Sequence, residues 1–264
     1  MTRRYGYSAH LGFLFTELPF SERFGAARRH GFSAVEHPAP YGVPAAQMAQ
    51  WLEQAGLPYV QFGLYSGDAA KGEKGLAIFP ERRDEFRASV TAGLDYAAAI
   101  GVGKLHAMAG ILPKTLRQPA HRDCYIENLA WAADRAAERG VVILVEAMSA
   151  GAVPDYFIET PDEAAAAIAD AGRGNIRLLL DVFHTVNSGL DPLAQIRAHA
   201  GAIGHVHIAD HPGRHEPGSA GIAFDEVRRA LAEAGYDGFI GCEYSPRAGT
   251  VGGLTWLAEE LAFE

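Results

Sequence analysis

The 264-residue sequence is poor in cysteine, with only Cys124 and Cys242. Two cysteines cannot build a disulfide framework, and Cys242 lies inside a predicted buried strand, so a reducing compartment is expected. The N-terminus begins with a short basic stretch, but polar and small residues follow it and leave no apolar signal core. We therefore expect a cytoplasmic protein.

The sequence also lacks an apolar run of about 20 residues, the length needed to span a bilayer. It has no basic run, and its formal net charge is -9 at pH 7. Nucleic acids and anionic membrane surfaces are therefore excluded as partners on electrostatic grounds. We expect the ligand to be a small molecule.

Strand-like and helix-like segments alternate along the chain, and 48% of the residues are hydrophobic. The pattern predicts one α/β domain over residues 1–264, a (β/α)8 TIM barrel. An open doubly wound sheet is the alternative, but no Gly-x-Gly-x-x-Gly motif follows the first predicted strand. The predicted strands are Tyr5–Phe13, Ser33–His37, Leu57–Leu64, Lys104–Ala109, Val141–Ala147, Arg177–Val182, Ile203–Ala209 and Gly238–Tyr244.

Helix-start signals lie between the predicted strands. Thr160 can cap a helix that begins at Pro161, with Glu163 completing a capping box. The pair Asp191-Pro192 begins another helix in the same way.

Four apolar runs of the second half end in a residue that can bind a metal: Glu146, Asp181, His207 and Glu243. A carboxylate or imidazole at the end of a buried strand is costly unless a cation or a counter-charge receives it. Three carboxylates and one imidazole suit a divalent cation, and the imidazole favours Mn2+ or Co2+ over Mg2+. The alternative is that each residue is buried beside an arginine. The absence of a thiolate argues against structural zinc.

Several short segments give the chain a family resemblance. They are Phe15-Thr16-Glu17-Leu18-Pro19-Phe20, His106-Ala107-Met108-Ala109-Gly110, Leu144-Val145-Glu146-Ala147, Leu180-Asp181-Val182-Phe183-His184, Arg214-His215-Glu216-Pro217 and Gly241-Cys242-Glu243-Tyr244-Ser245-Pro246-Arg247. In this order and spacing, the chain resembles the hydroxypyruvate isomerase group of the xylose-isomerase-like barrels. The resemblance covers nearly the whole chain.

The resemblance implies an isomerase that interconverts a small hydroxy-carbonyl acid, either hydroxypyruvate with tartronate semialdehyde or 2-oxo-tetronate with 3-oxo-tetronate. Related ketose 3-epimerases carry a metal set that would fall on the four strand-ending residues, and their two glutamates, here Glu146 and Glu243, transfer protons. The implied reaction passes through an enediolate. Hydroxypyruvate isomerases tend to have Gln in place of His207, so a ketose 3-epimerase acting on a neutral sugar is an alternative. A non-catalytic sugar-binding barrel is another.

Further residues are candidates for binding substrate. His184 and His106 could contact substrate hydroxyls or support the metal ligands. The planar fork of Arg214 suits a substrate carboxylate, although a loop ion pair with Glu216 would also explain it. Glu216 could orient Arg214 or a substrate hydroxyl. Lys71 lies in a long loop that could act as a lid, or it is solvated.

Three other residues are expected to be buried and structural: His10, Glu36 and His205. The parity of the strand places His205 on the same face as His207, one layer deeper. Among the aromatic residues, Phe13 and Tyr65 are the best candidates for ligand contact. We also expect a homo-oligomer, a dimer or tetramer.

Overall fold

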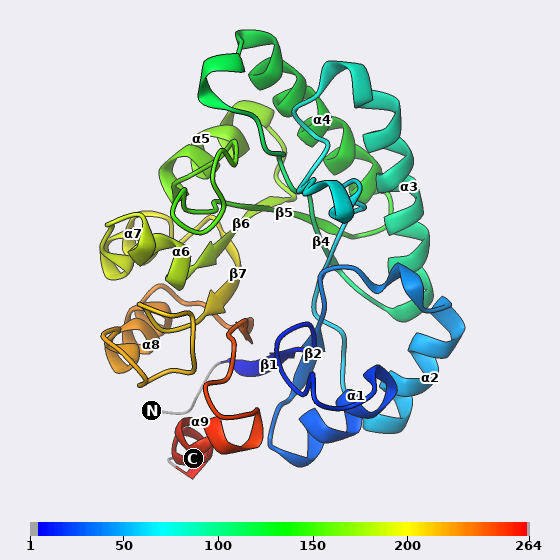
Figure 1. Ribbon diagram of the computed structural model, residues 1–264. Helices are drawn as coiled ribbons and strands as arrows, with labels where there is room; N and C mark the ends of the chain where they lie inside the picture. The colour runs from blue at the N-terminus through cyan, green and yellow to red at the C-terminus, as the bar shows by residue number, and fades with distance from the viewer. Residues whose placement is uncertain (1–4, 263–264) are drawn as a thin grey trace.

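A computed structural model describes residues 5–262, and it has eight parallel strands surrounded by helices (Figure 1). The prediction of a (β/α)8 barrel is confirmed. The strands are β1 Gly6–His10, β2 Ala34–Glu36, β3 Phe62–Gly63, β4 Lys104–His106, β5 Val142–Glu146, β6 Ile176–Asp181, β7 Ile203–Ile208 and β8 Phe239–Cys242.

The barrel is nearly closed. The strand order is β2-β1-β8-β7-β6-β5-β4-β3, so the seam lies between β2 and β3. A parallel bridge between Val35 and Tyr59 crosses this seam, and the Val60 N–H donates to the Val35 carbonyl at 2.9 Å. Only a few hydrogen bonds therefore join the described residues across the seam, whereas the other neighbouring strands pair in continuous ladders.

Most predicted strands are longer than the strands in the structure, and the first and third differ the most. The first was predicted to reach Phe13, but the chain turns after His10, whose carbonyl accepts the N–H groups of Phe13 and Leu14 at 2.9 Å. The third was predicted over 57–64, but β3 spans only Phe62–Gly63. Its predicted start includes Pro58, which has no N–H to donate to a ladder.

The helices of residues 5–262 lie outside the strands (Figure 1). They are α1 Phe20–Arg29, α2 Ala45–Ala55, α3 Arg83–Ile100, α4 Pro119–Ala137, α5 Pro161–Ala171, α6 Val182–Asn187, α7 Pro192–Ala198, α8 Phe224–Glu233 and α9 Thr255–Ala262. None of them is long and apolar enough to cross a membrane.

Both predicted helix starts are confirmed. Thr160 and Glu163 form the reciprocal capping box at α5, and the Asp191 carboxylate accepts the Leu193 N–H at the start of α7. These caps satisfy N–H groups that an α-helix leaves without an internal partner.

The pairing of β6 with β7 sets the position of the functional side chains. A register shift between Leu178 and Leu179 pairs Leu179 with His205 and Asp181 with His207. Residues two apart on a strand share a face, so both histidines point into the barrel. Asp181 and His207 consequently lie side by side at the carboxyl ends of their strands, where barrel enzymes place their active sites.

Candidate active site

The structure brings the four predicted metal ligands together. Glu146 ends β5, Asp181 ends β6, His207 lies near the end of β7, and Glu243 directly follows β8. Each offers one ligand atom, and these atoms all lie within 4.8 Å of one another. Three of the side chains are buried and that of Glu243 is 14% exposed, so the cluster opens to solvent on the Glu243 side.

The donor set fits a divalent cation. Within residues 5–262, two buried atoms of the cluster, Asp181 Oδ2 and His207 Nδ1, have no hydrogen-bond partner. Buried polar atoms normally have hydrogen-bond partners, and a carboxylate oxygen that lacks one beside two other carboxylates is stabilised by positive charge. Oxygen ligands with one imidazole nitrogen suit Mn2+ or Co2+ and also admit Mg2+.

Arg214 lies at the opening of this cluster. Its Nη2 donates to Glu243 Oε2 at 2.5 Å and lies 3.6 Å from Asp181 Oδ2. Phe13 and Phe183 each lie 5.1 Å from the guanidinium carbon, measured to the ring centroid, in cation–π contact. These contacts hold the positively charged guanidinium group of Arg214 at the mouth of the barrel.

The backbone at Arg214 is also constrained. Its φ of 55° is in the left-handed region that residues other than glycine rarely adopt. The Arg214 N–H donates to the Asp210 carbonyl at 3.0 Å, and its own carbonyl accepts the Ser245 N–H at 2.8 Å. Both neighbouring loops therefore fix where the side chain leaves the backbone.

The two glutamates have opposite electrostatic environments. Burial raises the pKa of Glu146 well above its ordinary value, and the charge of Glu243 raises it further. Burial acts in the same direction on Glu243, but Arg214, His207 and His10 outweigh it and hold its pKa well below the ordinary value. Pairs of carboxyl groups with divergent pKa values are typical of proton-transfer sites.

His184 is held in one tautomer by Ser149. Its Nδ1 faces both the Ser149 N–H, at 3.3 Å, and the Ser149 hydroxyl, at 2.9 Å. The Asn187 amide donates to that hydroxyl oxygen at 2.7 Å, which turns the hydroxyl proton toward the imidazole. Nδ1 is therefore an acceptor, and the proton of neutral His184 lies on Nε2.

Two further histidines touch the glutamates. His106 Nε2 lies 3.6 Å from Glu146 Oε2, and burial lowers the pKa of His106 to about 3. His10 Nε2 lies 3.3 Å from Glu243 Oε1, and burial lowers its pKa as well. Both rings are therefore neutral neighbours of the carboxylates.

The remaining predicted substrate-binding residues make other contacts. The Glu216 carboxylate accepts the Arg247 N–H at 3.1 Å. The Lys71 ammonium pairs with Asp68 at 3.3 Å, and the Lys71 side chain is 74% exposed. Among the described residues, neither has a recorded hydrogen bond or ion pair with the four predicted metal ligands.

Four residues that contact the site were not predicted from the sequence to belong to it: His10, Glu36, Ser149 and Asn187. His10 and Glu36 were expected to be buried structural residues, and both are buried, but they also contact Glu243 and His207. Ser149 and Asn187 were not identified at all. Their only signal is proximity in sequence to Glu146 and His184, which is too weak to select them.

The family model described as xylose isomerase-like TIM barrel matches residues 24–260. The chain belongs to this family. It is 38% identical to the 2-oxo-tetronate isomerase of Cupriavidus necator, over 97% of this chain and 98% of that protein. It is 32% identical to the hydroxypyruvate isomerase of Escherichia coli, over 95% of this chain and 97% of that protein.

A solved structure described as an AP endonuclease, family 2, from Brucella melitensis has the same fold, with a TM-score of 0.93 and 38% identity. The match covers 96% of this chain and 98% of that one. The resemblance to the hydroxypyruvate isomerase group is thus confirmed, and the named curated relatives are isomerases, in agreement with the predicted enzyme class.

Proposed function

We propose that this member of the family is a metal-dependent isomerase that moves a carbonyl group between adjacent carbons of a small hydroxy-carbonyl acid. Hydroxypyruvate and 2-oxo-tetronate are the substrates that the relatives suggest. The observation that carries the proposal is the convergence of Glu146 and Glu243, with opposite pKa shifts, beside Arg214 at the barrel mouth.

Glu146, Asp181, His207 and Glu243 would hold the divalent cation, most favourably Mn2+. When bound, such an ion supplies positive charge that makes a C–H beside a carbonyl more acidic. Glu146 ends β5 and Glu243 directly follows β8, so they would face opposite sides of a bound substrate. One removes a proton from the hydroxyl-bearing carbon beside the carbonyl, which gives an enediolate, and the other delivers a proton to the former carbonyl carbon. The hydroxyl proton passes to the former carbonyl oxygen, so that the carbonyl and the hydroxyl exchange places.

The other residues of the site bind and orient. Arg214 would receive the substrate carboxylate, because a planar guanidinium pairs with it through two parallel hydrogen bonds. His184 offers an Nε2–H donor to a substrate oxygen, and His106 is the equivalent neutral group beside Glu146. Lys71 and Glu216 are proposed to contact substrate only if their loops move, because both pair elsewhere.

Incubation of Mn2+-loaded protein in D2O with hydroxypyruvate, a 2-oxo-tetronate and several ketoses tests this proposal. We expect NMR to show deuterium at C3 of the 2-keto acid and at C2 of the isomerised product. Label at C3 of a ketose would instead identify a ketose 3-epimerase, the alternative that the imidazole ligand His207 supports. Inertness toward every compound would indicate a non-catalytic sugar-binding barrel.

We further infer a cytoplasmic homo-oligomer, a dimer or tetramer. The thiols of Cys124 and Cys242 are buried and form no disulfide, which supports a reducing compartment. Light scattering coupled to size-exclusion chromatography measures the assembly, and a monomeric mass would contradict this part of the proposal.

A further inference from the structure

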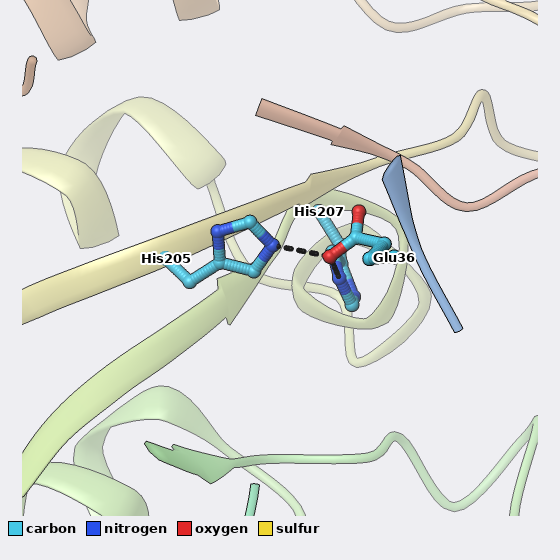
Figure 2. Close-up of side chains that lie close together, drawn as sticks. All are labelled: Glu36, His205 and His207. Atoms are coloured by element: carbon cyan, nitrogen blue, oxygen red, sulfur yellow. Dashed lines mark hydrogen bonds and ion pairs between the residues drawn. The ribbon is translucent and has the colours of Figure 1, made fainter. Parts of the chain in front are cut away.

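Glu36 crosses the inside of the barrel to reach His207. It lies on β2, and the strand order places β1 and β8 between β2 and β7. Its carboxylate is completely buried, yet Oε2 lies 2.8 Å from His205 Nε2 and 3.4 Å from His207 Nε2. Figure 2 shows the carboxylate linked to both rings. Gln61 donates to the same oxygen at 3.1 Å.

Strand β8, which lies beside β7, leaves space for the Glu36 side chain to reach His207. Gly241 lies on β8, where a Cβ atom would stand 2.0 Å from Glu36 Oε1 and 2.5 Å from His207 Cδ2. Any side chain would therefore displace the carboxylate or the imidazole. The register partner of Gly241 on β1 is Ser8, another small residue. Glycine at position 241 is thus required by the contact between Glu36 and His207.

The two nitrogens of His207 face different partners. Nε2 points to Glu36, whereas Nδ1 lies 3.3 Å from Glu243 Oε2 and 4.0 Å from Glu146 Oε1. When a cation is bound, a proton that stays on Nε2 and is donated to Glu36 would leave the lone pair on Nδ1 directed at the cluster of carboxylates. Carboxylates that accept from a metal-binding imidazole fix its tautomer and orientation in this way.

We propose that Glu36 is the positioning residue of the metal site, which holds His207 with Nδ1 toward the cation, and that Gly241 supplies the space this requires. The proposal rests on the proposed metal site and goes beyond it by assigning a residue on the opposite side of the barrel. His205 and Gln61 anchor the same carboxylate oxygen. Glu36 and His205 are at hydrogen-bond distance, 2.8 Å, so they contact each other directly and not through a second ion. We therefore infer one cation per chain.

Titration of metal-free protein with Mn2+, followed by calorimetry and by the EPR signal of free Mn2+, tests the proposal. Glu36→Gln removes the negative charge and keeps the shape, and we expect it to weaken Mn2+ binding roughly 10- to 100-fold. Gly241→Ala should also weaken Mn2+ binding, because the added methyl group would displace Glu36 or His207. Asn128→Leu is the control: Asn128 is a buried residue of α4 and donates to the Ala77 carbonyl, so its loss should lower stability and leave the Mn2+ Kd unchanged.

An unchanged Mn2+ Kd in folded Glu36→Gln protein would overturn the proposal, as would two Mn2+ ions per wild-type chain. A measurement without variants covers the case in which neither substitution folds. In Mg2+-loaded wild-type protein labelled with 15N at histidine, NMR should place the His207 proton on Nε2, and a proton on Nδ1 would refute the inference. Wild-type protein that binds no metal would instead refute the proposed function.

Discussion

Arg214 donates to Glu243 over 2.5 Å while two phenylalanine rings flank its guanidinium group. The arginine comes from the loop after β7 and the glutamate from the residue after β8, so the contact joins two loops at the barrel mouth. It places a positive charge where a substrate carboxylate would enter.

Arg214→Ala should lower kcat/KM for a keto acid, because a hydrogen bond to a charged group is worth about 1.5–3 kcal/mol, or roughly 10- to 100-fold. Arg214→Lys keeps the charge and loses the fork, so it should restore only part of the loss. Steady-state kinetics measure both, with Arg122→Ala on α4 as an exposed control. Equal activity of wild type and Arg214→Ala toward acids would show that the arginine does not bind the carboxylate.

Glu146→Gln and Glu243→Gln should each reduce turnover roughly 100- to 10,000-fold, because each removes a proton-transfer group. Deuterium exchange from D2O into substrate, followed by NMR, reports the first proton transfer even if the second is blocked. Glu127→Gln, on the exposed surface of α4, is the matched control. Near-full activity in both site variants would rule out the proposed mechanism.

Removal of the metal by a chelator should abolish turnover, and Mn2+ should restore it better than Mg2+. A ligand at 100 times its Kd stabilises the folded state by about 2.7 kcal/mol. For a domain of this size, that corresponds to a rise in Tm of roughly 5–10 °C. Calorimetry with and without Mn2+ measures the shift, and a Tm insensitive to every divalent cation would contradict the assignment of the cluster as a metal site.

Acid should destabilise the fold partly through His37. Burial, with smaller contributions from His10 and Arg23, lowers the pKa of His37 from 6.5 to about 4. Between these values the unfolded chain binds a proton that the folded chain does not, so this contribution to stability is lost as the pH falls from 6.5 toward 4.

His37→Asn removes this titration and retains an acceptor for the Ala39 N–H, which donates to His37 Nδ1 at 3.2 Å. Urea unfolding at pH 7.5 and at pH 5.0 should therefore show a smaller loss of stability in the variant than in wild type. The same loss in both proteins would mean that His37 does not titrate as described.

The sequence predicted the parts of the fold that depend on local pattern. Continuous apolar runs marked β5 to β8, and the residue that ends each run indicated the cluster at the mouth. The predicted strands were mostly too long, and the largest errors were at the end of β1 and the start of β3, where the turn after His10 and the missing N–H of Pro58 limit the pairing. Such limits depend on neighbouring strands as much as on the segment itself.

The supporting contacts of the site could not be predicted from the sequence. Glu36 and His207 are separated by 171 positions, and their contact depends on the closure of the barrel and on the space at Gly241. In the sequence, a single glycine in a strand can equally indicate a position that only weakens the sheet. Only the three-dimensional arrangement shows which side chain occupies the space it leaves.

The candidate ligands all come from β5 to β8 and the residue after β8, whereas Glu36, His10 and Phe13 come from β1, β2 and the loop after β1. A half-barrel fragment that begins at β5 would inherit every candidate metal ligand but would lack the carboxylate that faces His207 Nε2. Joining this half to the first half of another barrel would therefore keep the candidate ligand atoms and remove the contact that fixes the orientation of the His207 ring.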